Sequence, residues 1–243
     1  MKTSLQRVDK KELRLKGIKE IVVLGDVGCT GFNEDSKKIF DEILRIKASL
    51  FFIMGDIAFS GKNPQFDEFI TFCNERLTAP AFALCGNHDI PGYAGYFGRS
   101  SYALIFDHAA CLFLDNSKAH FQERDLKFLK EELEKYKEKR FIILFHIPPP
   151  VSFNRSCMGA DEWGKLRRVL DAHKEKIECI ICAHIHGYYN YRLDGYNIFI
   201  TAGGGAAMIY DLPREELKAH NYLKLSLHGD ASINIAIKRI VKE

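Results

Sequence analysis

The first ninety residues alternate between short apolar runs and amphipathic segments, and this alternation limits the possible folds more than any other feature. The apolar runs 18–26, 49–56 and 79–89 have the length and composition of buried strands, whereas segments 33–48 and 64–77 carry apolar residues at helical spacing. Parallel strands joined by crossover helices produce this order of elements. The sequence therefore predicts an α/β fold with a parallel sheet.

The later part of the chain first continues this pattern and then changes it. We predict two strands around an Asp-His turn over 101–117, helices over 123–140 and 161–176, and buried strands over 141–150 and 177–186. The last sixty residues contain shorter alternating runs that suit antiparallel pairing. A parallel sheet with an antiparallel extension is therefore expected.

No repeat, low-complexity segment or long linker divides the chain, so we predict one domain over residues 1–243. Its start, residues 1–17, is a basic arm. The first twenty residues carry seven Lys or Arg and three acidic residues, which gives 7 − 3 = +4. A charge run of this kind is typical of a solvated arm or a short helix.

Composition and charge exclude several classes of protein. Hydrophobic residues make up 47% of the chain, enough to fill a core, and the net charge of +3 is too small to indicate a nucleic-acid partner. We find no secretory signal and no apolar run near the ~20 residues of a membrane span, so no membrane partner is expected. Most of the seven cysteines lie in apolar strands, as is typical of reduced thiols. We therefore predict a cytoplasmic protein.

Polar side chains follow the predicted buried strands, at the point where each strand ends. They are Asp26, Asp56, Asn87, His146, His184 and His186. Because the carboxyl ends of parallel strands meet at one edge of a sheet, we expect these side chains to lie close together. Each aspartate alone also suits a turn, and His146 alone also suits a core histidine. Together they form an oxygen and nitrogen ligand set that suits Mn²⁺, Fe²⁺ or Zn²⁺.

The motifs around these residues resemble the calcineurin-like metallophosphoesterases over about residues 20 to 205. The motifs are GD (25–26), GD (55–56), GNHD (86–89), FH (145–146) and AHIH (183–186), with FLDNS (113–117) and TAGGGA (201–206) as further landmarks. The resemblance implies a four-layer αββα sandwich around two divalent metal ions. It also implies hydrolysis of a phosphoester by attack of a metal-bound hydroxide.

The resemblance assigns a role to each residue. Asp56 would bridge the two ions, and Asp26 and His186 would hold the first ion. Asn87, His146 and His184 would hold the second ion. His88 would protonate the leaving group or stabilise the phosphate charge, and Asp89 would accept a hydrogen bond from the other nitrogen of the His88 ring.

The first motif departs from the family pattern, which usually has Asp-x-His. Here Gly28 stands in place of the histidine, so the first metal site lacks one expected ligand. Purple acid phosphatases share the glycine but add a ligand tyrosine where this chain has Phe59. Water, Cys29 or Asn33 could fill the gap, although a thiolate at Cys29 would need an electropositive setting. Alternatively, the first site is weak and the protein works with one tightly held ion. We favour a weakened but occupied first site. A Gly28→His substitution should then tighten the binding of the first ion.

The substrate is less well defined by the sequence. The aromatic segment 90–102 and the segment 148–164, with Arg155, are candidates for the rim of the site. We predict a small phosphodiester or phosphomonoester substrate. The alternative is a non-catalytic or weakly catalytic scaffold of the same fold that binds proteins.

Overall fold

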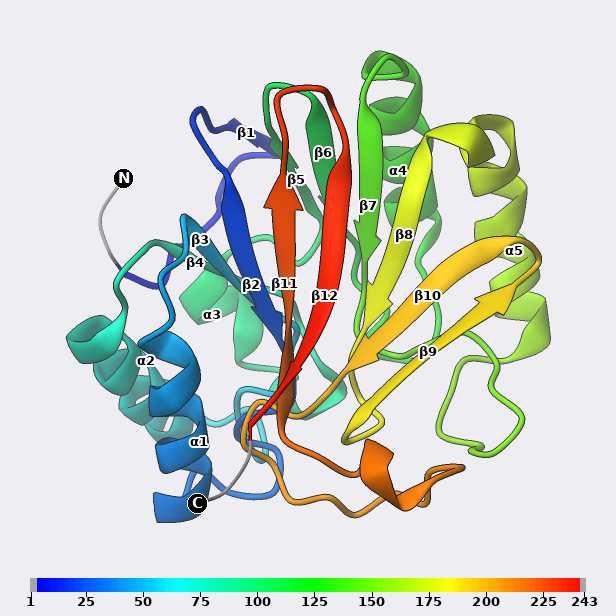
Figure 1. Cartoon of the computed structure of the whole chain (residues 1–243). Coiled ribbons are helices and arrows are strands. Elements are labelled where there is room, and N and C mark those ends of the chain that lie inside the picture. The colour runs from blue at the N-terminus through cyan, green and yellow to red at the C-terminus, as the bar shows by residue number, and fades with distance from the viewer. Residues whose placement is uncertain (1–3, 241–243) are drawn as a thin grey trace.

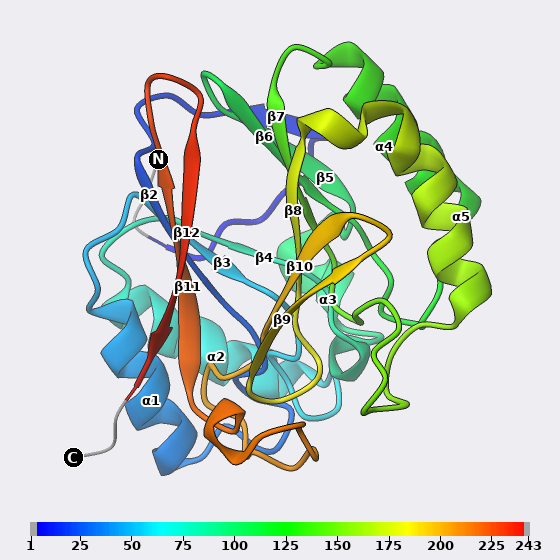
Figure 2. The ribbon, with the colours of Figure 1, turned by 45° about the vertical axis from the view of Figure 1, so that its right-hand side comes forward.

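The computed structural model describes residues 4–240 and consists of two β-sheets packed face to face with helices outside them. Helices α1 (Glu34–Leu44) and α2 (Asn63–Arg76) cover one sheet, and α4 (Glu123–Lys135) and α5 (Ala160–Leu170) cover the other (Figures 1 and 2). This arrangement confirms the predicted α/β, four-layer αββα sandwich. Within the described residues, no helix is long and apolar enough to cross a membrane.

The five-stranded sheet has the order β12-β11-β2-β3-β4. Its strands are β2 (Glu20–Leu24), β3 (Leu50–Ile53), β4 (Ala81–Ala83), β11 (Asn221–Leu227) and β12 (Ile233–Arg239). β2, β3 and β4 are parallel, whereas β11 pairs antiparallel with both β2 and β12. The predicted crossover order of the first ninety residues is therefore correct.

The seven-stranded sheet has the order β1-β5-β6-β7-β8-β10-β9. Its strands are β1 (Glu12–Arg14), β5 (Tyr102–Ile105), β6 (Ala109–Phe113), β7 (Arg140–Leu144), β8 (Ile177–Cys182), β9 (Tyr188–Leu193) and β10 (Tyr196–Thr201). β6, β7 and β8 are parallel, whereas β9 and β10 form an antiparallel hairpin from the alternating runs of the last sixty residues. β10 also pairs with β8, but in parallel, which the predicted antiparallel pairing did not include.

Alternation along β2 explains why the sheets stack. Ile21 and Val23 pack into the core that includes the space between the sheets, while Val22 and Leu24 pack into a second core with α1 and α2. All four side chains are fully buried. A strand that is apolar on both faces therefore fits a position covered by a sheet on one side and by helices on the other.

The short helices were not predicted, and two predicted helices are shorter than expected. The additional turns are η1 (Asn87–Asp89), α3 (Tyr93–Phe97) and η3 (Glu215–Leu217). The predicted helix 123–140 ends at Lys135, and 161–176 divides into α5 and the 3-10 segment η2 (Asp171–Lys176).

The basic N-terminal segment is not the solvated arm or short helix that its charge pattern predicts. Residues 12–14 form β1, which pairs with β5 at the edge of the seven-stranded sheet. Leu5 forms a bridge to Ala81 of the other sheet, and Val8 is buried. The edge strands offer unpaired backbone groups, and pairing with them outweighs the preference of lysine and arginine for solvent. The segment thus connects the two sheets.

Candidate metal centre

The structure brings all six predicted ligand side chains to one edge of the sandwich, where β2, β3, β4, β7 and β8 end (lower edge in Figure 1). Within residues 4–240, two groups of ligand-type side chains each place their atoms within 4.8 Å of one another. One group is Asp26, Cys29 and His186. The other is Asp56, His146 and His184. Cys29, which the sequence offered only as one way to fill a gap, thus lies within the first group.

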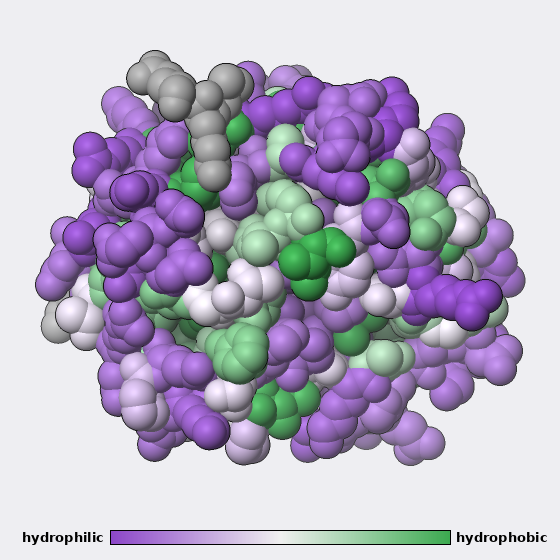
Figure 3. Space-filling model, turned by 90° about the horizontal axis from the view of Figure 1, so that it is seen from below, coloured by the Kyte–Doolittle hydropathy of each residue, from purple (hydrophilic) through white to green (hydrophobic). Residues whose placement is uncertain are grey.

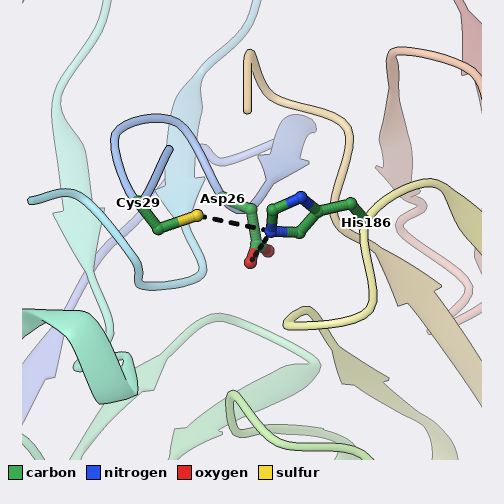
Figure 4. A group of neighbouring side chains, drawn as sticks. All are labelled: Asp26, Cys29 and His186. Atoms are coloured by element: carbon green, nitrogen blue, oxygen red, sulfur yellow. Dashed lines mark hydrogen bonds and ion pairs between the residues drawn. The ribbon is translucent and has the colours of Figure 1, made fainter. Parts of the chain in front are cut away.

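In the first group, one edge of the His186 imidazole faces both a carboxylate and a thiol (Figure 4). Its Nε2 atom is 3.5 Å from Oδ1 of Asp26 and 3.3 Å from Sγ of Cys29. The Nδ1–H on the other side of the ring donates to the carbonyl oxygen of Ala207. That bond turns Nε2 toward the other two side chains, as metal-binding histidines require.

In the second group, the buried imidazole of His146 faces oxygen atoms from the turns that follow two different strands, β3 and β4. Its Nε2 atom is 3.3 Å from Oδ1 of Asp56 and 3.1 Å from Oδ1 of Asn87. Its Nδ1 atom lies 2.7 Å from the carbonyl oxygen of Met54, which fixes the ring. The ring of His184 lies 5.2 Å from that of His146. Asn87 therefore joins this group.

Three of these residues have backbone angles that side chains rarely adopt. Asp26, Asp56 and His184 have φ values of 59°, 54° and 71°. Such left-handed conformations cost free energy for residues other than glycine and cluster at functional sites, where the surrounding structure enforces them. Here the amide of Asp26 donates to Gly55 and the amide of His184 donates to the carboxylate of Asp26. The sharp turn at each strand end directs the side chain to the shared edge.

Buried charges dominate the electrostatics of the site. Burial lowers the pKa of His146, but the adjacent Asp56 carboxylate outweighs this and raises it to about 10. Burial likewise raises the pKa of Asp56, but His146 holds it well below its ordinary value. Burial and the positive charge of His146 lower the pKa of His184 to about 4, so this imidazole is neutral at neutral pH. Neutral imidazole is the form that binds metals.

A divalent cation fits this site, because two buried polar atoms lack partners. Among the described residues, neither Oδ1 of Asp26 nor Nδ1 of His184 has a hydrogen-bond partner. A buried polar atom left without a partner costs free energy, and such atoms in a folded protein call for an explanation such as an ion. Carboxylate, imidazole and amide groups facing one another form a donor set for a first-row divalent metal.

Burial also affects the Cys29 thiol. Desolvation, followed by the negative charges of Asp26 and Asp56, raises the pKa of Cys29 far above its ordinary value. Without a bound cation, Cys29 is therefore a neutral thiol. A thiolate requires a positively charged environment, and here a bound cation would have to supply it. Asn33, the other candidate, is used elsewhere, because its side chain accepts the amides of Asp35 and Ser36 and caps α1.

Asp89 does not accept a hydrogen bond from the His88 ring, which corrects the prediction. Its carboxylate is fully buried and accepts four backbone amides at 2.8–2.9 Å, from Asp56, Ile57, Ala58 and Gly86. The ring of half-buried His88 instead places Nδ1 2.8 Å from the carbonyl oxygen of Phe59. The backbone amides of the turn after β3 compete with the His88 ring for the Asp89 carboxylate. The amides take this acceptor because the compact loop holds them directly against it.

Gly28 is required by close packing. A Cβ atom at this position would lie 1.8 Å from the carbonyl oxygen of Ile57, and the amide of Gly28 donates to Asp56. No side chain fits at that separation while the backbone stays in place. The expectation that Gly28→His tightens a metal site is therefore wrong, because histidine would first displace the turn that carries Asp56.

Gly28→Ala is expected to lower the free energy of unfolding by about 1–3 kcal/mol or more, because the added methyl group overlaps the backbone of Ile57. Urea denaturation of the metal-free proteins measures the change. Gly159→Ala is the control: within the structure as described, a Cβ there meets nothing within 4 Å. Equal stability of Gly28→Ala and wild type would show that the turn can relax and that packing does not select glycine.

The sequence pattern missed two residues that shape the site. Asn116 is fully buried and accepts the amides of His146 and Ile147, so it positions the His146 turn. It lies in the FLDNS landmark, which was the available signal.

Tyr210 packs its ring 5.1 Å from that of His186 and 6.1 Å from that of His184. No local pattern marked Tyr210, because it reaches the site from a loop far along the chain.

The aromatic segment 90–102 is mostly core rather than a rim of the site. Tyr93 and Tyr102 are buried, and both hydroxyls donate to the carbonyl oxygen of Ala83. Phe97 is buried as well. These three rings therefore do not form the rim of the site that the sequence suggested. Arg155 of the other segment is exposed, and the neighbouring Ser156 contacts Tyr210.

Solved structures with the same fold include several phosphatases. The purple acid phosphatase PPD1 from yellow lupin (Lupinus luteus) seeds matches with a TM-score of 0.74 and 14% identity over 93% of this chain and 52% of that chain. A dimetal phosphatase from Danio rerio matches with a TM-score of 0.67 and 14% identity over 91% of this chain and 96% of that chain. GAP50, the anchor in the inner membrane complex of Plasmodium, matches with a TM-score of 0.70 and 14% identity over 91% of this chain and 84% of that chain.

The chain spans about half the length of the lupin enzyme. At these identities the likeness establishes the fold. Among curated protein sequences, none matches this chain significantly. The family model of the calcineurin-like phosphoesterases matches residues 19–188, which is more than two thirds of the chain and contains all six predicted ligands. The chain therefore belongs to the calcineurin-like phosphoesterase family.

Proposed function

We propose that the protein is a metal-dependent hydrolase of small phosphomonoesters or phosphodiesters. The observation that carries the proposal is the pair of adjacent ligand groups at the strand ends, with two buried ligand atoms that form no hydrogen bond within residues 4–240. Asp26 and His186 would hold the first ion, and Asn87, His146 and His184 the second. Asp56 would be shared. Mn²⁺, Fe²⁺ and Zn²⁺ all suit these ligands.

When bound, two divalent ions would activate water as the nucleophile and neutralise charge on the phosphoryl group. The protein's own contribution is to fix the ligands and to supply a proton donor. The amide of His88 donates to Oδ1 of Asp56, which places this residue beside the shared carboxylate. Because Nδ1 of His88 faces the carbonyl oxygen of Phe59, Nε2 is the atom left to face a leaving-group oxygen, to which the imidazolium form of His88 would donate its proton.

Apolar side chains near the site favour a substrate with an apolar or aromatic group. The large hydrophobic side chains with high exposure in the described chain are Phe59, 55% exposed, and Ile209, 63% exposed. The ring of Phe59 lies 6.2 Å from that of His88, and Ile209 precedes Tyr210, which packs on His186. Apolar side chains gather near the middle of the face at this end of the molecule (Figure 3). An aryl phosphate ester is therefore a suitable first substrate.

His88→Ala is expected to lower kcat for an aryl phosphate by about 100- to 10,000-fold, because the leaving oxygen loses its proton donor. Metal content should stay at the wild-type value, since His88 is not among the proposed ligands. Steady-state kinetics and elemental analysis of the same preparation measure both quantities. The matched control is His120→Ala, because His120 is exposed and its ring nitrogen lies 2.9 Å from the carbonyl oxygen of Lys118, outside both ligand groups.

A metal-loaded protein that hydrolyses no phosphoester, with or without His88, would favour the second candidate function. That candidate is a scaffold that binds proteins, and the likeness to GAP50, described as an anchor, supports it. A wild-type rate that His88→Ala leaves unchanged would instead overturn the role proposed for His88 and leave the hydrolase in place.

A further inference from the structure

The first ligand group has an unusual third member. It contains one carboxylate, one imidazole and one thiol. Gly28, where the family usually has a histidine ligand, carries no side chain, and the thiol belongs to the next residue, Cys29. The turn after β2 directs this thiol inward: Gly28 donates its amide to Asp56, and Gly31 donates its amide back to Gly28. Cys29 is only 3% exposed. Its position is thus set by the same contacts that exclude a side chain at residue 28.

A second observation, independent of the cysteine, points to an ion at this place. Asp26 is 0% exposed, and its Oδ1 atom has no hydrogen-bond partner among residues 4–240. That oxygen, Sγ of Cys29 and Nε2 of His186 lie within 4.8 Å of one another (Figure 4). Three ligand-type atoms from two distant segments therefore surround one point, and one of them is a buried carboxylate oxygen that accepts no hydrogen bond within the described residues and lies 3.5 Å from Nε2 of His186.

We propose that Cys29 is a ligand of the first ion through its thiolate sulfur, together with Asp26, His186 and the shared Asp56. This inference rests on the proposed metal centre and deepens it. The thiol proton leaves to solvent when the ion binds, so the metal–sulfur bond replaces the sulfur–hydrogen bond. Cys29 then supplies the ligand that Gly28 cannot supply.

A sulfur ligand changes which metal the site prefers. Thiolates favour Zn²⁺, Fe²⁺ and Co²⁺ over the harder ions Mg²⁺ and Mn²⁺, which prefer oxygen. The second group offers carboxylate, amide and imidazole ligands and no sulfur. The two sites are therefore chemically unequal, and the first is the one selective for zinc or iron.

Cobalt binding to the full chain tests this proposal. We expect Co²⁺ added to two equivalents to produce a thiolate-to-cobalt charge-transfer band in the near ultraviolet, in addition to weak visible bands from both ions. Cys29→Ser should lose the charge-transfer band and keep the visible bands of the second site. Cys85→Ser is the matched control, because Cys85 is also 3% exposed but its thiol contacts the carbonyl oxygen of Gly86.

Zinc affinity provides a second readout. Loss of even an outer partner of a metal ligand weakens binding by about 10- to 100-fold, so Cys29→Ser should weaken the first zinc site by about 100-fold or more. X-ray absorption of the zinc-loaded wild type should show one sulfur at about 2.3 Å, a result that does not depend on whether a variant folds.

The outcomes separate the two proposals. Two bound ions without a charge-transfer band and without a sulfur neighbour would overturn the role of Cys29 and leave the metal centre intact. A band that persists in Cys29→Ser would overturn it as well. A wild-type chain that binds no Co²⁺ and no Zn²⁺ would overturn the metal centre itself.

Discussion

Asp89→Ala is expected to unfold most of the protein at room temperature. The carboxylate of Asp89 is fully buried and accepts four backbone amides, which would all lose their partner. Each unsatisfied buried donor costs about 1–3 kcal/mol, so the sum is about 4–12 kcal/mol. That sum is comparable to the whole stability of a typical domain, about 5–15 kcal/mol. Urea denaturation followed by circular dichroism measures the loss.

Two further variants make this result interpretable. Asp89→Asn keeps one acceptor oxygen and should lose an intermediate amount of stability. Asp115→Ala is the matched control, because Asp115 also follows a strand, β6, at this edge of the sheet, and within the described residues its side chain accepts hydrogen bonds from Ser117. If Asp89→Ala lost no more stability than Asp115→Ala, the turn could satisfy its amides in another way, and Asp89 would not organise the site.

Asp56→Asn is expected to lower kcat/KM for an aryl phosphate by at least about 1,000-fold, which is about 4 kcal/mol of transition-state stabilisation. The amide keeps the shape of the side chain and an oxygen that can accept from His88, but it removes the charge that both ions would share. The variant should also retain at most one ion per chain. Kinetics and elemental analysis on the same sample measure both effects.

Asp115→Ala again serves as the control for Asp56→Asn, because it belongs to neither ligand group. It should keep both ions and the wild-type rate. Wild type treated with a chelator should fall to the level of Asp56→Asn and recover when Mn²⁺ or Zn²⁺ is restored. Full activity of Asp56→Asn with two ions bound would mean that another group joins the two sites.

The sequence was sufficient to predict how the strands place polar residues at one edge. Apolar runs such as 49–56 are buried on both faces, and crossover helices force them to be parallel, so Asp26 and Asp56 had to lie side by side. His184 and His186 are separated by one residue after β8, yet they join different ligand groups, as the resemblance of the AHIH motif implies. Strand alternation alone would place both rings on one face, and it does not predict the positive φ of His184.

The features that the sequence did not predict depend on contacts between distant segments. Asp89 binds amides more than thirty residues away, which no local pattern reports. β1 forms because an edge strand lies beside it, although its charges favour solvent. Aromatic residues occur both on binding surfaces and in cores, so the sequence alone did not distinguish the two positions for Tyr93 and Tyr102. In the structure both hydroxyls donate to the carbonyl oxygen of Ala83, which holds the two rings in the core.

The central claim is that this edge of the sandwich holds two divalent ions, and counting them tests it most directly. The full chain, purified without chelator and then dialysed against Zn²⁺ or Mn²⁺, should contain about two ions per chain by elemental analysis. Asp56→Asn, treated in the same way, should contain at most one. A wild-type chain that retains none after both treatments would contradict the account.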